Sequence, residues 1–99
     1  MKEMSITQMH DKAGKAAAIL KSMSNENRLI ILCHLGISEM SVTQLNEVIP
    51  LSQSSLSQHL AKLRKEKLVK TRRESQTIYY SIADDIVSKM ITLLHNEYC

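Results

Sequence analysis

The chain has 99 residues and a mass of 11.2 kDa, with 13 Lys and Arg against 10 Asp and Glu and 43% hydrophobic residues. One domain of this length has room for a small core, so its size argues against a large catalytic pocket. Two Gly, one Pro and no aromatic residue other than three Tyr favour helices and exclude collagen-like and disordered classes. We expect one mainly helical domain over residues 1–99.

Targeting signals and cysteine patterns also narrow the class of protein. Cys33 and Cys99 are too few for a disulfide scaffold and do not form a Cys-x-x-Cys pair. Charged residues interrupt the first fifteen positions, so no secretory signal is present, and no apolar run approaches the roughly 18 residues of a membrane span. We therefore expect a soluble protein of the reducing cytoplasm with no membrane partner.

Two helices are predicted in the N-terminal third of the chain. Residues 1–10 show no clear period and are expected to form a loose lead-in. Residues 11–23 place Ala and Leu at helical spacing, with lysines between them. A second, strongly apolar helix follows a cap at Ser24 or Asn25 and is expected to end at Gly36, a residue typical of the position after a helix.

The central residues have the pattern of a helix-turn-helix. Ser41 and Gln44 form a capping-box pattern, and Pro50 ends the helix that they begin. Ser52 then begins a fourth helix, whose buried face is expected to carry Leu56, Leu60 and Leu63. Two such helices joined by a short turn are typical of DNA-binding proteins, in which the second helix enters the major groove.

After Lys67 the period of the sequence changes from helical to alternating. Residues 68–74 and 77–82 read as two β-strands joined by Ser75 and Gln76. Ser-Gln is a weak hairpin turn, so this prediction depends on the flanking runs. The expected fold is a winged helix-turn-helix: four helices, a small β-hairpin wing and a final helix.

The final helix is expected to begin at Asp84 or Asp85 and to run to about Tyr98. Its apolar arc is wider than one surface helix needs, and the first helix has an Ala-rich face. Palindromic DNA sites need a two-fold partner, so we expect a homodimer through the first and last helices. The alternative is that both helices only close the core of the monomer.

Positive charge is concentrated in one part of the chain. Between Lys62 and Arg73 there are seven Lys and Arg against the single acid Glu66, which leaves +6 there and −3 over the rest of the chain. Such a patch is typical of phosphate contact, although a solvated charged face would look similar. The candidate phosphate contacts are Lys62, Arg64, Lys65, Lys70, Arg72, Arg73 and Gln76. The candidates for reading base edges are Gln53, Ser54, Ser57, Gln58 and His59.

Residues 23–32, residues 51–60 and the wing together resemble the ArsR/SmtB family of bacterial winged-helix regulators over nearly the whole chain. The C-terminal Leu-Leu-His-x-x-Tyr-Cys and the two-cysteine layout are most similar to the HlyU/BigR/YgaV branch of that family. The resemblance implies a homodimer that binds inverted repeats in double-stranded operator DNA.

The metal sites known in that family do not transfer to this chain. The metal-binding motif of the third helix falls on residues 39–45, where Ser41 and Thr43 replace the two thiolates, and hydroxyls bind soft metals poorly. His95 and Glu97 are the candidates near the last-helix site, and no His accompanies Asp84 and Asp85 at the required spacing. We expect no metal and no cofactor.

The two cysteines are then the candidate sensor. In the resembled branch, such a pair is implicated in sensing reactive sulfur species or oxidants through a disulfide or polysulfide link, which implies this role for Cys33 and Cys99. Otherwise Cys33 is a small buried residue and Cys99 a frayed terminal one. The resemblance fits both a virulence-gene activator and a repressor of sulfide-handling genes.

Other classes of function remain as alternatives. They are a metal-responsive repressor and a winged-helix protein-interaction module that binds no DNA. No enzyme is expected, because no catalytic pairing of Ser, His, Cys and Asp is suggested and no Gly-rich phosphate loop is present.

Overall fold

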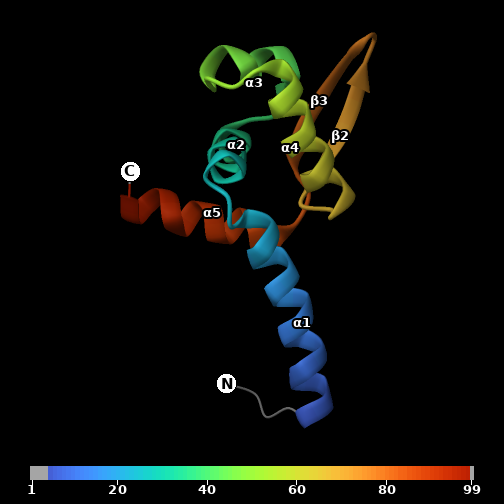
Figure 1. Ribbon diagram of the computed structural model, residues 1–99, viewed down its shortest axis with the longest axis vertical. Helices are drawn as coiled ribbons and strands as arrows, with labels where there is room; N and C mark the ends of the chain where they lie inside the picture. The colour runs from blue at the N-terminus through green and yellow to red at the C-terminus, as the bar shows by residue number, and fades with distance from the viewer. Residues whose placement is uncertain (1–4, 99) are drawn as a thin grey trace.

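The computed structural model describes residues 5–98 and contains five helices and three strands within that range (Figure 1). In chain order they are α1 (Ile6–Met23), α2 (Glu26–Ile37), β1 (Met40–Ser41), α3 (Val42–Val48), α4 (Gln53–Lys65), β2 (Val69–Glu74), β3 (Thr77–Ile82) and α5 (Asp85–Tyr98). The expected mainly helical class and winged helix-turn-helix order are confirmed.

The core lies where α2, α3, α4 and α5 meet the sheet. Leu56, Leu60 and Leu63 of α4 are completely buried, as their helical spacing predicts. Burial of one such side chain contributes roughly 1.5–3 kcal/mol to folding. The other buried apolar side chains are Met23, Ile31, Leu32, Leu35, Leu45, Ile49, Leu68, Val69, Val87 and Ile91. The packing fixes α4 to the body by one face and leaves the opposite face outward.

The sheet has three antiparallel strands in the order β1-β3-β2, one strand more than the predicted hairpin. Arg72 pairs with Tyr79, and Glu74 pairs with Thr77 at the two-residue turn. The extra strand β1 covers two residues beside β3, and a pair of residues is too short to show the alternation that identifies a strand. Because β1 pairs with β3, the backbone of the wing is hydrogen-bonded to the residues that begin α3.

Helix α1 begins five residues earlier than the lead-in prediction allowed. Ser5 accepts a hydrogen bond from the Gln8 backbone N–H at 3.1 Å, and the Gln8 side chain accepts one from the Ser5 N–H at 3.1 Å. This reciprocal capping box satisfies two N–H groups that a helix start would leave without partners. Residues 6–10 are therefore helical, and the part of the predicted lead-in before residue 5 lies outside the described residues.

Helix α2 ends one residue later than predicted, with Gly36 inside its last turn instead of after it. A Cβ at Gly36 would lie 3.2 Å from the Cγ2 of Ile91 on α5. This glycine thus serves the close approach of two helices, and Ser38 follows the helix as its C-cap.

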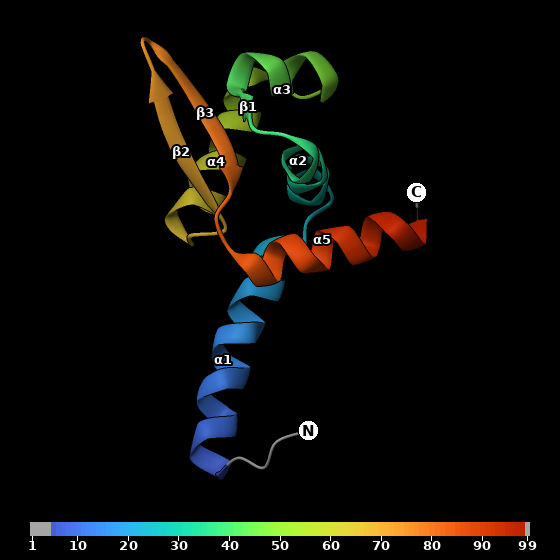
Figure 2. The same cartoon turned by 180° about the vertical axis from the view of Figure 1, so that it is seen from behind.

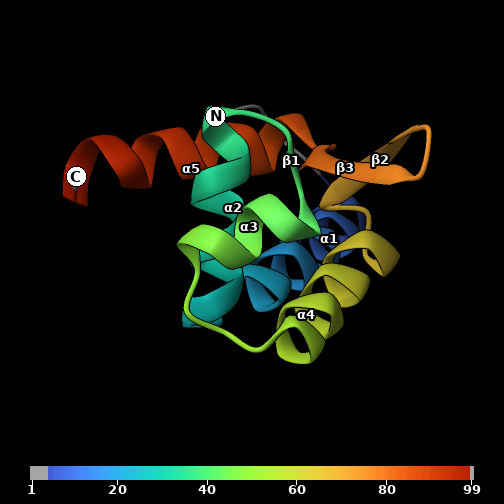
Figure 3. The same ribbon diagram turned by 90° about the horizontal axis from the view of Figure 1, so that it is seen from above.

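The two terminal helices extend from the body. α1 points away from the rest of the chain in Figures 1 and 2, and the last turns of α5 extend past α2 in Figure 3. The Cα radius of gyration is 15.0 Å, whereas a compact chain of this length has about 13 Å. Among the described residues, no helix has the combination of length and apolar character needed to cross a membrane.

Candidate nucleic-acid interface

The turn between α3 and α4 is fixed by side-chain hydrogen bonds to the backbone. The Ser41 hydroxyl accepts from the Gln44 N–H at 3.2 Å, and Asn46 donates through Nδ2 to the Leu51 carbonyl at 2.7 Å. The Ser52 hydroxyl accepts from the Ser55 N–H at 3.1 Å. The predicted caps of both helices are confirmed, and they hold α4 at a defined angle to α3.

The outward face of α4 carries the predicted base-reading side chains. Gln53, Ser54, Ser57 and Gln58 are exposed, whereas His59 is half-buried toward the body. Residues four apart lie on one side of a helix, so Gln53 lies above Ser57 and Ser54 above Gln58. Amides and hydroxyls can both donate to and accept from base edges, and Gln can bind adenine through two hydrogen bonds.

The basic run does not form one continuous patch with this face. The tip of the wing lies at the end of the molecule where α3 packs and α4 begins, and the end of α4 lies toward α1 (Figures 1 and 2). Lys62 and Lys65 follow Gln53 by nine and twelve residues, which is about 14–18 Å along a helix axis. The +6 segment is therefore split between the far end of α4 and the wing.

Lys62 forms an ion pair within its own helix end, with the C-cap residue of α4. Its ammonium lies 3.3 Å from Glu66 Oε1. Glu66 also accepts a hydrogen bond from the hydroxyl of Ser22, a residue buried at the end of α1, and Arg28 donates through Nε to the Ser22 carbonyl at 2.6 Å. Through Glu66, Lys62 lies at the edge of a polar junction of α1, α2 and α4, and it is exposed, as are Arg64 and Lys65 beside it.

At the wing tip, Arg73 and Gln76 are exposed. Arg73 donates through Nε to the Ser75 carbonyl at 3.2 Å, across the two-residue turn. Ser75 has a φ of 58°, the positive value that the first position of such hairpin turns requires. The weak Ser-Gln turn is therefore a true hairpin turn, with Arg73 two residues before Ser75 and Gln76 within the turn itself.

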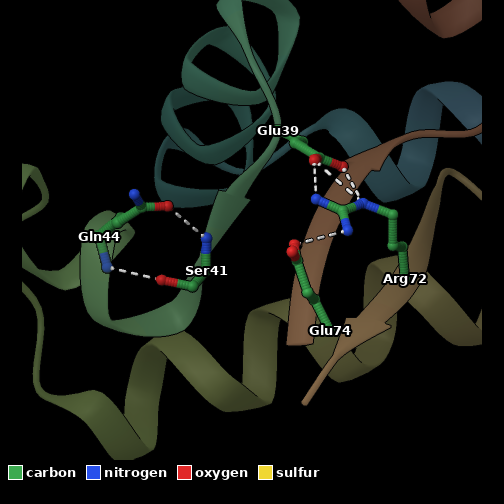
Figure 4. Close-up of polar contacts among 5 residues, drawn as sticks. All are labelled: Glu39, Ser41, Gln44, Arg72 and Glu74. Atoms are coloured by element: carbon green, nitrogen blue, oxygen red, sulfur yellow. Dashed lines mark hydrogen bonds and ion pairs between the residues drawn. The ribbon is translucent and has the colours of Figure 1, made fainter. Parts of the chain in front are cut away.

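Arg72 has a different environment from Arg73, because alternate residues of a strand face opposite sides. Its Nε donates to both oxygens of Glu39 at 3.1 and 3.2 Å, its Nη2 also binds Glu39, and its Nη1 lies 2.9 Å from Glu74 Oε2 (Figure 4). The guanidinium carbon lies 4.7 Å from the centroid of the Tyr79 ring. Hydrogen bonds from Arg72 hold the pKa of Glu39 below its ordinary value, and bonds to Glu39 and then Glu74 raise the pKa of Arg72.

Sequence reasoning missed this cluster, which we call the wing tie: Glu39, Arg72, Glu74 and Tyr79. The i, i+2 spacing of Arg72 and Glu74 on one strand was a usable signal for their contact. Glu39 is 33 residues from Arg72 in the sequence, and no local pattern connects them.

The structure places Cys33 on α2, half-buried against the core and facing α5. Cys33 and His95 together line a cavity of about 120 Å³, with Ile91 and Thr92 of α5 on its wall. They also line a larger, more open cavity of about 440 Å³. Cys99 lies outside the described residues.

The described part of the chain offers no cluster of metal ligands. Across residues 5–98, no three His, Cys, Asp or Glu side chains are grouped as a metal ion would require. The hydroxyl of Ser41, at one former thiolate position of the family motif, is used in the capping box of α3.

Comparisons with known proteins agree with this geometry. Residues 25–71 match the family model described as bacterial regulatory protein, arsR family. The chain is 49% identical to the transcriptional activator HlyU of Vibrio cholerae over 97% of this chain and 89% of the relative. It is 43% identical to the regulator YgaV of Escherichia coli, covering 95% of this chain and 96% of the relative. It is 34% identical to a biofilm growth-associated repressor of Agrobacterium fabrum, covering 98% and 83%.

Solved structures show the same similarity in three dimensions. Reduced HlyU from Vibrio cholerae superposes with a TM-score of 0.90 at 49% identity, covering 95% of this chain and 99% of that one. A homodimeric winged helix-turn-helix DNA-binding domain from Mycobacterium bovis superposes with a TM-score of 0.78 at 27% identity, covering 96% and 87%. The chain therefore belongs to the arsR family of bacterial regulatory proteins, as an HlyU-like winged-helix protein that binds DNA and regulates transcription.

Proposed function

We propose that the protein binds inverted-repeat operator DNA as a homodimer, with α4 in the major groove of each half-site. The supporting observation is the division of α4 into two faces. Leu56, Leu60 and Leu63 anchor it in the core, and four amide and hydroxyl side chains point outward beside a wing. One recognition helix reads only a few base pairs, so a two-fold pair of them is needed for a specific site.

In this proposal the side chains divide into two roles. Gln53, Ser54, Ser57, Gln58 and His59 read bases, and Arg64, Lys65, Lys70, Arg73 and Gln76 contact phosphates, with Lys62 at the edge of the contact. Phosphate contacts supply affinity without sequence choice, and base contacts supply the choice.

Apolar side chains of α1 and α5 support the homodimer. Ile6, Met9 and Leu20 of α1 and Ile86, Leu93 and Tyr98 of α5 are all more than half exposed. Between these helices and α2 lies a groove of about 450 Å³ lined by Leu20, Met23, Leu29, Met90, Leu93 and Leu94. A second copy of the same two helices has the apolar character that would cover this surface, and the Mycobacterium bovis relative is described as homodimeric.

Salt-dependent DNA binding tests the division of roles. We expect Arg73→Glu to weaken binding to all sequences and Gln58→Ala to relax the preference at particular base pairs. An operator selected from random DNA would supply the probe, and its single-base variants would report preference. If the two variants behaved alike, the assignment of phosphate and base contacts would be wrong. If affinity did not fall with added salt, the DNA interface itself would be wrong.

We also propose that Cys33 and Cys99 form a thiol switch that responds to reactive sulfur species or oxidants. The cavity shared by Cys33 and His95 supports this, because His95 precedes Cys99 by only four residues in the sequence. Two thiols would lose two protons and two electrons to a peroxide or polysulfide and form a disulfide. A polysulfide link would in addition take up zero-valent sulfur from the polysulfide, which is left shorter by the sulfur atoms that it transfers. Since operator DNA and the reduced thiol state both belong to the cytoplasm, the proposal places the protein there.

Mass spectrometry after polysulfide treatment, with a parallel DNA titration, tests the switch. We expect a Cys33–Cys99 link and weaker operator binding, and we expect Cys33→Ser to bind DNA equally before and after treatment. Unchanged DNA affinity after a confirmed link would rule out the switch. This test does not address whether the regulated genes are activated or repressed. One relative is named an activator and another a repressor.

A further inference from the structure

The guanidinium group of Arg72 is already occupied on the side that faces β1. Every nitrogen of the group has a carboxylate partner, since Nε and Nη2 bind Glu39 and Nη1 binds Glu74. Paired carboxylate oxygens match the fork of an arginine in the way that phosphate oxygens do. Glu39 thus occupies the paired Nε and Nη2 donors, a site at which a DNA phosphate could otherwise bind through two oxygens.

The charge around Arg72 also opposes a phosphate contact. Glu39 and Glu74 carry two negative charges against one positive charge, so the wing tie has a net charge of −1. A phosphate that approached Arg72 would meet both carboxylates at close range, and like charges repel at such distances. Arg73, on the opposite face of β2, is exposed and donates through Nε to a backbone carbonyl instead of a carboxylate.

The wing tie crosses the whole sheet. Arg72 on β2 lies over Tyr79 on the central strand β3 and reaches Glu39, which immediately precedes β1. The backbone of β1 pairs with β3, and Ser41 at its end is the N-cap of α3. The outermost strand of the wing is therefore connected by a side chain to the start of the helix-turn-helix.

We propose that Arg72 and Glu39 are positioning residues that set the wing against the helix-turn-helix, and that Arg72 stays bound to Glu39 in the DNA complex. Arg72 then contributes to DNA affinity through the placement of Arg73 and Gln76, and not through its own contact with phosphate. This removes Arg72 from the phosphate contacts that the sequence indicates.

The dependence of DNA affinity on salt shows whether an arginine contacts phosphate or only positions other residues. Loss of one phosphate contact reduces the slope of log K against log salt by about 0.9, whereas loss of a positioning contact lowers affinity and leaves the slope unchanged. We expect Arg72→Gln and Glu39→Gln each to lower operator affinity about threefold to fivefold, the range that an exposed ion pair can supply. Both slopes should equal that of the unmodified protein, and Arg73→Gln should lower the slope by about 0.9.

Matched variants distinguish the loss of the Glu39–Arg72 contact from the loss of a negative charge. Glu74→Gln removes the same negative charge from the wing tie but leaves the Glu39–Arg72 pair, and we expect its affinity to change by less than about twofold. The double variant Glu39→Gln/Arg72→Gln should bind as each single variant does, because both remove one contact. The exchange Glu39→Arg/Arg72→Glu should recover most of the affinity. A single cooperative thermal unfolding transition in each variant would confirm that it folds.

The proposal is overturned if Glu39→Gln tightens binding, since that result would mean that Glu39 competes with phosphate for Arg72. It is also overturned if Arg72→Gln lowers the salt slope by about 0.9 or if neither single variant changes affinity. In the DNA complex, the Nε–H resonance of Arg72 should keep its free-state chemical shift, and that of Arg73 should move. Failure of Arg73→Gln to change the slope would instead count against the proposed DNA interface, independently of Arg72.

Discussion

At the scale of single residues, the protonation of Glu39 determines when the wing tie exists. Hydrogen bonds from Arg72 hold the pKa of Glu39 below its ordinary value. A carboxyl with a lowered folded-state pKa adds stability above its unfolded-state pKa, and this stability is lost as the pH falls through the folded-state pKa. The tie is therefore complete at neutral pH and breaks only in acid, below the ordinary glutamate pKa of about 4.3.

An NMR titration of the Glu39 carboxyl carbon checks this prediction. Its midpoint should lie below that of an unpaired glutamate, and Arg72→Gln should raise the midpoint toward the ordinary value. The same midpoint for Glu39 with and without Arg72 would contradict the proposed cause of the shift.

At the scale of elements, the end of α4 carries a residue in an unfavourable conformation. Lys67 has a φ of 64°, and the Leu68 N–H binds the Leu63 carbonyl at 2.9 Å, the pattern in which glycine usually occupies the position of Lys67. We expect Lys67→Gly to stabilise the fold by about 1 kcal/mol, because a left-handed conformation costs a lysine roughly that much. In thermal unfolding this is an increase of about 4–8 °C in Tm.

The matched control for this prediction is Lys65→Gly, which removes the same charge two residues earlier. Lys65 is the last residue of α4 and keeps a helical conformation, in which glycine is less favourable than lysine, so the Tm of this variant should fall. If both substitutions lowered Tm, the strain at Lys67 would not be significant.

The elements that the sequence predicts well are those specified by nearby residues. The caps at Ser41 and Ser52, the buried face of α4 and the hairpin all follow from spacings within one or two turns. The same kind of signal was available for the start of α1, where Ser5 and Gln8 have capping-box spacing. It was missed because the preceding and following residues show no helical period.

The features that the sequence does not predict depend on long-range pairing. β1 becomes a strand through its contact with Tyr79 and Tyr80 of β3, and its own two residues show no pattern. For the candidate interface, helical period places the outward face of α4 correctly. The contact of Glu66, the partner of Lys62, with Ser22 of α1 and the engagement of Arg72 by Glu39 are tertiary contacts, which the count of basic residues could not reveal.

At the scale of the whole molecule, the exposed apolar faces of α1 and α5 allow the proposed association of two chains to be tested by substitution. We expect Leu93→Glu to convert the proposed homodimer into a monomer and to lower operator affinity by at least about tenfold. The physical reason is that a charge would be buried in the interface, and a monomer would bind through a single half-site. Sedimentation velocity would measure the mass, and a DNA titration the affinity.

Val48→Glu is the control, since Val48 is exposed to a similar extent on α3 but lies away from α1 and α5. It should leave the sedimentation coefficient unchanged. A dimer that survives Leu93→Glu and also Leu20→Glu would place the interface elsewhere on the molecule.

The projection of α1 from the body has a thermodynamic consequence. Its residues 6–18 are exposed, and only its last turn packs against the rest of the described chain, so most of the helix gains little from tertiary burial. An isolated helix of about 12–15 residues is marginal in water even when it is rich in Ala. In the proposed homodimer, formation of α1 and association of two chains are therefore linked equilibria, and each shifts the other by mass action. The measurement that checks this is circular dichroism at 222 nm on dilution below the dissociation constant. The helical signal should fall by about a fifth, because residues 6–18 make up about that share of the helical residues. The cellular concentration of the protein would then set how much of its first helix is folded.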